Sequence, residues 1–239
     1  MKFEVSQLTS EITSSLQQPI HLSVKAGETL CISGASGIGK SVLLRCLADL
    51  VPHTGKMSLN GESSLTMSAD QWRRRVCLLP AESQWWYVSV GEHFKGNQSN
   101  NERVNHVVDR NIESEFEQSC FRQLDFKAEV LQWRIDRLST GEKQRLSLLR
   151  VLHKKPEVLL LDEPFSNLDP TSRFQLKKIL KELQEKKNMC MLISSHDLNH
   201  VTEVCRRIVV LHEGEIVHDM ETNKNTLKEL EAFFAVKGD

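Results

Sequence analysis

The sequence of 239 residues predicts an α/β fold built on a parallel β-sheet. An apolar run at 29–33 ends in a glycine-rich loop and is followed by leucines at helical spacing. Farther along the chain, two apolar segments of strand length, 158–161 and 189–194, enclose another segment with helical spacing. Because parallel strands need a crossover connection, usually a helix, this alternation predicts parallel strands joined by helices.

The first strand and helix flank the glycine-rich loop. Residues 29–33 are Thr-Leu-Cys-Ile-Ser, a run whose length and apolar character suit one buried strand. The leucines after the loop share one helical face: Leu43, Leu44, Leu47 and Leu50. We therefore expect a helix whose buried face extends to Leu50.

The second half of the chain continues the alternation. The helical segment between the two later strands carries four apolar residues: Leu176, Ile179, Leu180 and Leu183. Residues 208–211 and 215–217 flank a short turn at Gly214 and predict a hairpin at the edge of the sheet. The strongly polar residues 96–111 predict a loop or the start of an exposed helix.

The composition limits the possible functions. With 31 Lys and Arg against 32 Asp and Glu, the net charge of −1 does not favour a nucleic-acid partner. Six cysteines occur without a CxxC pair or a histidine cluster, which indicates reduced thiols and neither disulfides nor a zinc site. No segment approaches the roughly 18 apolar residues of a membrane span, and the N-terminus lacks the apolar centre of a signal peptide. These features predict a cytoplasmic protein.

The loop after the first strand fits the pattern G-x-x-x-x-G-K-[ST] at every fixed position. Its residues are Gly34, Ala35, Ser36, Gly37, Ile38, Gly39, Lys40 and Ser41. Glycines allow backbone amides to face inward around a phosphate, the lysine adds a cation, and the serine hydroxyl can bind Mg²⁺. A glycine-rich turn with a chance lysine is the alternative, but the flanking strand and helix favour a nucleotide site.

Two carboxylates follow the apolar strand at 158–161. The carboxyl end of a parallel strand is where α/β sheets bind ligands. Asp162 would hold Mg²⁺ directly or through water, and Glu163 would polarise the attacking water. The alternative is a turn that only ends the strand before Pro164, but a phosphate loop needs an acidic partner for its metal.

Residues 138–142, Leu-Ser-Thr-Gly-Glu, precede an apolar helix that contains Leu146, Leu148, Leu149 and Leu152. Ser139 and Glu142 form the S-x-x-E pattern of a capping box, which needs no ligand. Capping does not explain Gly141, because glycine costs about 1 kcal/mol in a helix. The close approach of a phosphate to the backbone would explain it.

In this order, the motifs resemble those of the ATP-binding cassette (ABC) family, over nearly the whole chain. The family signature LSGGQ is similar to residues 138–142, about twenty residues before the Asp162-Glu163 pair. Asn167-Leu168-Asp169 resembles the D-loop, and His196 resembles the switch histidine. The resemblance implies ATP as the cofactor together with Mg²⁺.

The resemblance also implies an architecture. Residues 1–239 would form a single cassette, with a P-loop NTPase core, a parallel sheet, an antiparallel β edge and an inserted helical subdomain at about 82–150. Two cassettes, identical or different, would pair head to tail, so that each phosphate loop faces the signature of the other chain. The resemblance implies these site residues: Glu163 and His196 for catalysis, Ser41 and Asp162 for the metal, and Ser139, Gly141 and Glu142 with the phosphate loop for nucleotide.

Two positions depart from the family pattern. The glutamine of the Q-loop falls on Ala81, which can neither bind a metal nor orient water, so Glu82 or Gln84 would have to replace it. The aromatic residue that usually stacks on adenine is missing near Ile12, and Phe3 is the only aromatic residue before the loop.

Aromatic residues surround the Q-loop segment: Trp72, Trp85, Trp86 and Tyr87. They either fill the core or, as the resemblance implies, line the groove that receives a membrane subunit. We expect the region at 72–87 to bind a permease and to hold the chain at the inner face of the cell membrane.

The resemblance thus favours the ATP-hydrolysing subunit of a transporter. The alternative is a soluble cassette ATPase of DNA repair or translation, but such proteins typically carry a second cassette or a long coiled coil. The short chain also resembles small bacterial cassettes that are assigned to metal or iron export.

Overall fold

The computed structural model describes residues 1–13, 16–94, 115–166, 168–197, 202–223, 225–226, 228–230 and 232. The expectations for 96–111 and for Asn167 lie outside these residues. The chain divides into two compact units. The first contains residues 1–81, 157–164 and 180–239, and the second contains residues 82–156 and 165–179.

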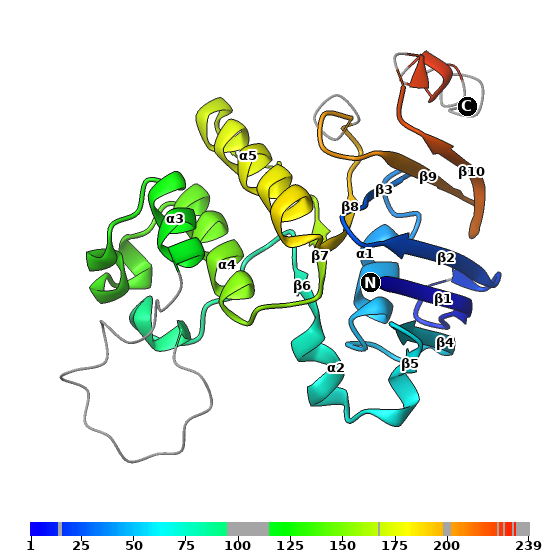
Figure 1. Ribbon diagram of the computed structural model, residues 1–239, viewed down its shortest axis with the longest axis horizontal. Coiled ribbons are helices and arrows are strands. Elements are labelled where there is room, and N and C mark those ends of the chain that lie inside the picture. The colour runs from blue at the N-terminus through cyan, green and yellow to red at the C-terminus, as the bar shows by residue number, and fades with distance from the viewer. Residues whose placement is uncertain are drawn as a thin grey trace. The chain divides into compact units, whose positions relative to one another are not determined.

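The first unit contains a six-stranded sheet in the order β10-β9-β3-β8-β7-β6 (Figure 1). Its strands are β3 (Thr29–Ser33), β6 (Val76–Leu79), β7 (Val158–Asp162), β8 (Cys190–Ser194), β9 (Arg207–His212) and β10 (Glu215–Glu221). Neighbouring strands from β9 to β6 pair in parallel, and β9 pairs with β10 as an antiparallel hairpin. The predicted α/β fold and the hairpin at the sheet edge are confirmed.

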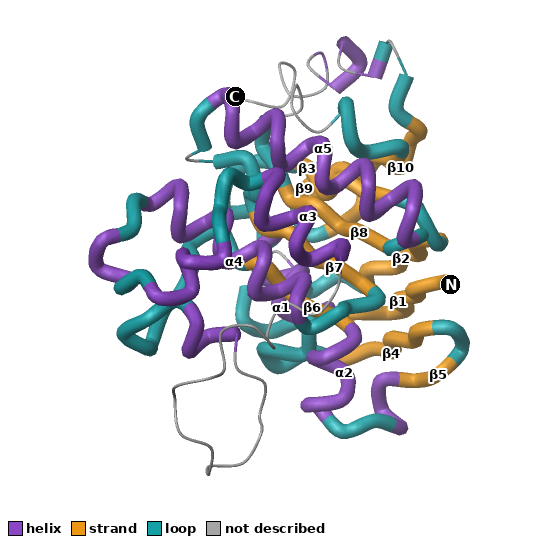
Figure 2. The backbone as a smooth tube through the Cα atoms, turned by 60° about the vertical axis from the view of Figure 1, so that its left-hand side comes forward, coloured by secondary structure: helices purple, strands orange, loops and turns teal. Residues whose placement is uncertain are grey.

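A second sheet of the same unit is antiparallel, in the order β2-β1-β4-β5. Its strands are β1 (Lys2–Thr9), β2 (Ile20–Lys25), β4 (Thr54–Leu59) and β5 (Glu62–Ser63), followed by the 3₁₀ turn η2 (Ser64–Thr66) and helix α2 (Ala69–Arg75). Figure 2 shows the strands of both sheets in orange. This sheet supplies the antiparallel part expected of the fold.

Helix α1 (Lys40–Leu47) packs on β6, β7 and β8. Leu43, Leu44 and Leu47 are fully buried, as predicted. The expectation for Leu50 is wrong, because its side chain is half exposed. The helix ends at Leu47, and Asp49 adopts a left-handed backbone conformation with φ 54°, which turns Leu50 out of the helical face.

Trp72 belongs to the core of the first unit. Its indole Nε1 donates a hydrogen bond to the carbonyl oxygen of Leu47 at 3.0 Å, and its ring lies 6.1 Å from that of Phe3. Both rings are buried. The expectation that the partner-binding region begins at Trp72 is therefore wrong at that residue, and the core interpretation holds there.

Among the described residues, the regular elements of the second unit are all helices or 3₁₀ turns. It contains η3 (Gly91–Phe94), α3 (Glu115–Gln123), η5 (Ala128–Gln132), η6 (Ile135–Arg137), α4 (Thr140–His153) and the first part of α5 (Pro170–Lys187). Helices α3 and α4 pack together, and the four predicted leucines of α4 are buried. The subdomain expected at about 82–150 lies within this unit, and its extent stays a prediction.

The remaining expectations concern α5, the thiols and the membrane. Leu176, Ile179, Leu180 and Leu183 of α5 are buried, as their spacing predicts. All six cysteines are buried thiols that form no disulfide in the part of the chain that the structure describes. Among the described residues, none of the helices combines the length and the apolar character that crossing a membrane requires.

Candidate functional site

The predicted phosphate loop joins the end of β3 to the start of α1. Three of its glycines have positive φ: 147° at Gly34, 78° at Gly37 and 98° at Gly39. A Cβ at Gly34 would lie 2.5 Å from the carbonyl oxygen of Leu211, whereas a Cβ at Gly37 would meet no atom within 4 Å. Glycine at 37 therefore allows the positive φ of the loop backbone, and the space beside it is open.

Lys40 places its ammonium inside this loop. Nζ donates hydrogen bonds to the carbonyl oxygens of Gly34 at 2.7 Å and Ala35 at 2.9 Å, and the residue is buried. Burial lowers the pKa of Lys40, while the negative charges of Glu163 and Asp162 oppose that shift. A partly desolvated cation in a glycine-rich loop before a helix suits a phosphate group.

Asp162 ends β7 and receives two hydroxyl donors. Ser41 Oγ donates to Asp162 Oδ1 at 2.9 Å, and Ser194 Oγ donates to the same oxygen at 2.6 Å. Hydroxyl and carboxylate oxygens are ligands that Mg²⁺ prefers, so Ser41 and Asp162 fit this ion. Among the described residues, no group of three His, Cys, Asp or Glu residues could hold a metal alone. Mg²⁺ commonly uses one or two protein ligands beside phosphates and water, so the small donor set suits it.

Glu163 adopts the left-handed conformation, with φ 47°. Its backbone N–H donates to the carbonyl oxygen of Ser194 at 3.2 Å and to Ser194 Oγ at 3.1 Å. Its Oε1 lies 2.9 Å from His196 Nδ1. A non-glycine residue at positive φ is strained, and the contacts to β8 hold it there.

Ser194 is a site residue that the sequence analysis missed. It is fully buried at the end of β8, where it pairs with Asp162 of β7. The only local signal is a serine at the end of an apolar strand, because a buried hydroxyl needs a hydrogen-bond partner. The identity of that partner depends on the strand register.

The signature residues lie at the start of α4 in the second unit. Ser139 Oγ accepts from Glu142 N at 3.2 Å, and Glu142 Oε2 accepts from Ser139 N at 2.8 Å, so the predicted capping box is present. The hydrogen bond from the Ser139 backbone lowers the pKa of Glu142. A Cβ at Gly141 would meet no atom within 4 Å, so no neighbour among the described residues requires glycine there.

The segment that resembles the D-loop is tied to α4 within the second unit. The Arg145 guanidinium lies 3.8 Å from the Asp169 carboxylate and donates to Ser172 Oγ. Asp169 in turn accepts from Ser172 N at 3.0 Å. This joins Arg145 of α4, three residues after the signature, to the residues after the acid pair in one polar network.

The predicted site residues form two groups, and the structure brings together the residues within each group. The phosphate loop, Asp162, Glu163 and His196 lie in the first unit, and Ser139, Gly141 and Glu142 lie in the second. Ala81 ends the first segment of the first unit, and the exposed Glu82 begins the second unit.

The two departures from the family pattern remain in the structure. Gln84, one of the proposed replacements for the Q-loop glutamine, is exposed, and its carbonyl oxygen accepts from Arg150 Nη1 at 2.9 Å. Phe3 is buried and is not available to stack on a base, whereas Ile12 is exposed.

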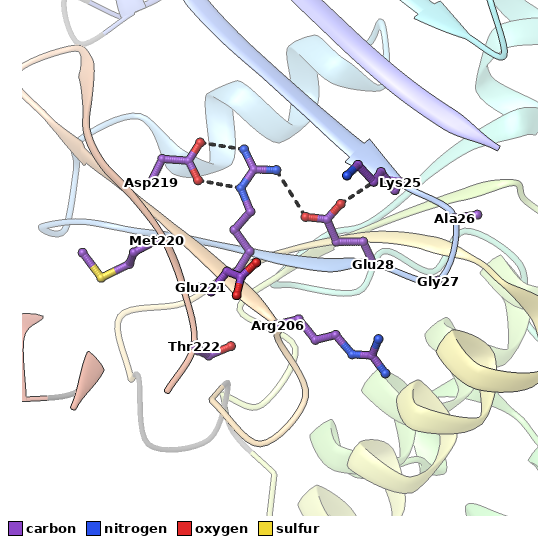
Figure 3. A pocket seen from close by; sticks show the side chains of 10 residues that line it. Lys25, Ala26, Gly27, Glu28, Arg206, Asp219, Met220, Glu221 and Thr222 are labelled. Atoms are coloured by element: carbon purple, nitrogen blue, oxygen red, sulfur yellow. Dashed lines mark hydrogen bonds and ion pairs between the residues drawn. The ribbon is translucent and has the colours of Figure 1, made fainter. Parts of the chain in front are cut away.

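A pocket of about 660 Å³ lies at the opposite end of β3 (Figure 3). It is lined by residues 25–28 before β3, Arg206 and Arg207 at the start of β9, and residues 219–222 at the end of β10. Arg207 binds the Asp219 carboxylate at 2.5 and 2.6 Å and Glu28 Oε1 at 3.2 Å. Because the phosphate loop begins after the other end of β3, this pocket is separate from the nucleotide site.

Comparison with known sequences identifies relatives. The sequence model described as "ABC transporter" matches residues 17–166. The sulfate/thiosulfate import ATP-binding protein CysA of Bradyrhizobium diazoefficiens is 34% identical over 222 residues, which cover 90% of this chain and 62% of that protein. The phosphonates import ATP-binding protein PhnC 1 of Ruegeria sp. is 28% identical over 241 residues, which cover 97% and 94%. The chain therefore spans less than two thirds of CysA and nearly all of PhnC 1.

A solved structure shares the fold. The dimeric post-hydrolysis state of the ATP-binding cassette MJ0796, bound to ADP and Pi, matches with a TM-score of 0.74 at 21% identity. The match covers 93% of this chain and 99% of that one. The predicted P-loop cassette fold is confirmed by this likeness.

The hydroxyl contacts of Asp162 predict the effect of removing Ser194. Ser194→Ala should lower the free energy of unfolding by about 1–3 kcal/mol, because a buried carboxylate loses a hydrogen-bond donor. Urea denaturation at neutral pH measures this loss. The control is Ser58→Ala, at a half-buried position on β4, which should change stability by less than about 0.5 kcal/mol. Equal small losses in both variants would contradict the structural role of Ser194.

Proposed function

The chain belongs to the ABC transporter family, and on this premise we propose that it hydrolyses ATP and drives a separate membrane permease. The observation that carries the proposal is the group of functional side chains at the carboxyl ends of β3, β7 and β8. Lys40 lies inside the phosphate loop, Ser41 contacts Asp162, and His196 contacts Glu163. Phosphoryl transfer to water requires a phosphate cradle, metal ligands and a group that orients water, and these residues have that chemistry.

Each residue has a proposed role. The loop amides and Lys40 bind the phosphates of ATP, and Ser41 and Asp162 hold Mg²⁺. When bound, Mg²⁺ neutralises charge on the phosphate oxygens. Glu163 orients the attacking water, and His196 holds the Glu163 carboxylate through the 2.9 Å contact to Oε1.

A second cassette completes the site in this proposal. Gly141 leaves the backbone at the start of α4 free of side-chain cover, and a helix N-terminus favours an anion such as the γ-phosphate. Ser139, Gly141 and Glu142 of one chain would then face the phosphate loop of the other, head to tail. The dimeric structure of the cassette MJ0796, which shares the fold, supports the pairing of two chains.

The relatives bear on the kind of transporter. CysA and PhnC 1 are both named import proteins, which supports import over export. The resemblance to cassettes of metal or iron export gains no support from these names, and neither does a role in DNA repair or translation. We propose an importer subunit that works at the inner face of the cell membrane, bound to its permease.

The proposed permease contact is a docking surface on the second unit, formed by Trp86, Tyr87, Val88 and Trp133. All four side chains are exposed, with 63% of Trp86 and 51% of Tyr87 accessible to solvent. Two backbone hydrogen bonds join the two segments: Val90 N donates to Trp133 O at 3.0 Å, and Ile135 N donates to Val88 O at 2.9 Å. Clustered exposed aromatic side chains are typical anchors of protein interfaces, so a cytoplasmic segment of the permease is the proposed occupant.

Variants of Lys40 and Glu163 should separate nucleotide binding from hydrolysis. Lys40→Ala should lose ATP binding, because it removes the cation at the phosphates. Glu163→Gln should keep ATP binding and accumulate an ATP-bound dimer, because only the activation of water is lost. Nucleotide binding, size-exclusion chromatography with and without ATP, and turnover measure these effects.

The control for these variants is Lys56→Ala, a change of an exposed lysine on β4 that should leave binding and turnover unchanged. Turnover close to that of the wild type in Glu163→Gln would refute the role given to this carboxylate.

Loss of the aromatic anchors should weaken attachment to the permease. Trp86→Ala and Tyr87→Ala should each reduce the fraction of the chain that sediments with membranes containing the permease by about tenfold, as expected for interface anchors. The membranes come from cells that express the permease, identified beforehand as the membrane protein that co-purifies with this chain. Turnover of the isolated chain should not change.

Phe174→Ala is the matched control, because Phe174 is an aromatic residue of the same unit that is 70% exposed and lies outside the docking surface. Equal sedimentation of Trp86→Ala, Tyr87→Ala and Phe174→Ala would show that the permease binds elsewhere.

A further inference from the structure

The central segment of the docking surface, residues 85–88, has no helix or strand of its own. Trp86 and Tyr87 nevertheless present large side chains to solvent. Exposed aromatic side chains act as anchors only when their backbone is held in one conformation, because ordering a mobile loop costs free energy on binding. The contacts that hold this backbone therefore control the docking surface.

The imidazole of His93 supplies those contacts. Nε2 accepts hydrogen bonds from the backbone N–H groups of Trp86 at 3.0 Å and Tyr87 at 3.1 Å. Nδ1 lies 3.0 Å from the carbonyl oxygen of Ser89. A ring nitrogen that accepts hydrogen bonds from two N–H groups carries no proton. The proton of the neutral ring is therefore on Nδ1, which donates a hydrogen bond to the carbonyl oxygen of Ser89. The contacts define a neutral imidazole of one tautomer.

Aromatic rings surround His93 on the docking side. The rings of Trp85, Trp86 and Tyr87 lie 4.8, 4.9 and 5.0 Å from the imidazole, all edge to face. His93 is itself buried. The three aromatic residues of the segment are thus arranged around one imidazole, which bonds the backbone of two of them.

The charges near His93 also favour the neutral form. The Arg150 guanidinium of α4 lies 4.6 Å from the Trp85 ring and 4.8 Å from the Trp86 ring. Burial is the main cause that holds the pKa of His93 below its usual range, and the positive charge of Arg150 lowers it further. Hydrogen bonds to the backbone of Ser89 and Val90 and the charge of Glu92 oppose the shift without reversing it. Burial also lowers the pKa of Arg150 to about 10, so Arg150 stays charged at neutral pH.

Among the described residues, the other charged groups near His93 are engaged with other partners. Glu92 Oε2 accepts from Ser89 N and Ser89 Oγ, both at 2.8 Å. Arg134, on the segment that bridges Ser89, pairs with Asp136 at 2.8 Å. Among the described charged groups, Arg150 is therefore the neighbour that most directly disfavours a second proton on His93.

We propose that neutral His93 is the positioning residue of the docking surface, and that protonation of its Nε2 releases the Trp86–Tyr87 backbone and weakens permease binding. A protonated Nε2 is a donor and cannot accept the two amide hydrogens. This inference rests on the proposed function, because it assigns the docking surface a regulator.

The direction of the pH dependence follows from the lowered pKa. The held conformation binds the proton less tightly than the released one, in which His93 has a usual pKa of about 6.5. The preference for the held conformation is therefore full above about pH 6.5 and is lost as the pH falls below it. Acidification should loosen the docking surface.

Amide hydrogen exchange measured by NMR tests the release. In the wild type, protection of the Trp86 and Tyr87 amides should fall about tenfold from about pH 8 to about pH 5, after correction for the intrinsic exchange rate. His93→Phe keeps an aromatic ring but no acceptor, so its protection should be low at both pH values. The amides of Leu148 and Leu149 inside α4 are the internal control and should stay protected.

The ring nitrogens of wild-type His93 provide a second measurement that needs no variant. Their ¹⁵N shifts should report the neutral form with the proton on Nδ1 at about pH 8. A proton on Nε2 at that pH, or full protection of both amides after the ring has become charged, would overturn the proposal. Full protection in His93→Phe would do the same.

Sedimentation with the permease membranes separates this inference from the proposed function. His93→Phe should reduce sedimentation several-fold at about pH 8, and wild-type sedimentation should fall between about pH 8 and about pH 5. If Trp86→Ala reduces sedimentation but His93→Phe and acidification do not, His93 does not control docking and the inference fails. If Trp86→Ala has no effect either, the proposed docking surface fails, while the exchange and ¹⁵N results still judge the role of His93 in the loop.

Discussion

The candidate active site depends on one constraint, the fixed position of the Asp162 carboxylate at the end of β7. One of its oxygens accepts hydroxyl hydrogens from Ser41 at the start of α1 and from Ser194 at the end of β8. The end of β7, the start of α1 and the end of β8 are therefore held together by hydrogen bonds to one carboxylate oxygen. Because Ser194 also holds the backbone N–H of Glu163, the same contacts orient the second carboxylate. The geometry of the metal ligands and that of the water-orienting group are thus linked through one buried serine.

The residues of the proposed site fall into two groups, one in each unit. The first unit offers a cation and carboxylates around open space at Gly37, and the second offers the capped start of α4 with open space at Gly141. Among the described residues, no neighbouring atom requires either glycine. The positive φ of Gly37 already favours glycine there. At Gly141, the proposed approach of a nucleotide and a second chain would explain the glycine, and hydrolysis would then be a property of two chains.

Local patterns could be predicted from the sequence, and contacts set by register could not. The phosphate loop, the acid pair and the capping box each depend on residues a few positions apart, and the structure reproduces them. Ser194 was missed because its partner lies on another strand, where pairing is set by the sheet. His93 was missed because its partners are backbone amides rather than a motif.

Leu50 was assigned to the helix because spacing alone does not reveal that Asp49 turns the chain. Trp72 was grouped with Trp86 although the boundary between the two units lies between them.

The claim that two chains complete each site is tested most directly by mixing two inactive variants. Lys40→Ala damages the phosphate loop, and Ser139→Arg blocks the start of α4, so each homodimer carries two damaged sites. In a mixed dimer one site combines both damaged halves and the other is intact. An equal mixture should therefore recover about a quarter of wild-type turnover, because half of the dimers are mixed and each has one working site of two. If mixed dimers form, as shown by co-purification of differently tagged chains, and the mixture stays as inactive as its parents, the head-to-tail account is contradicted.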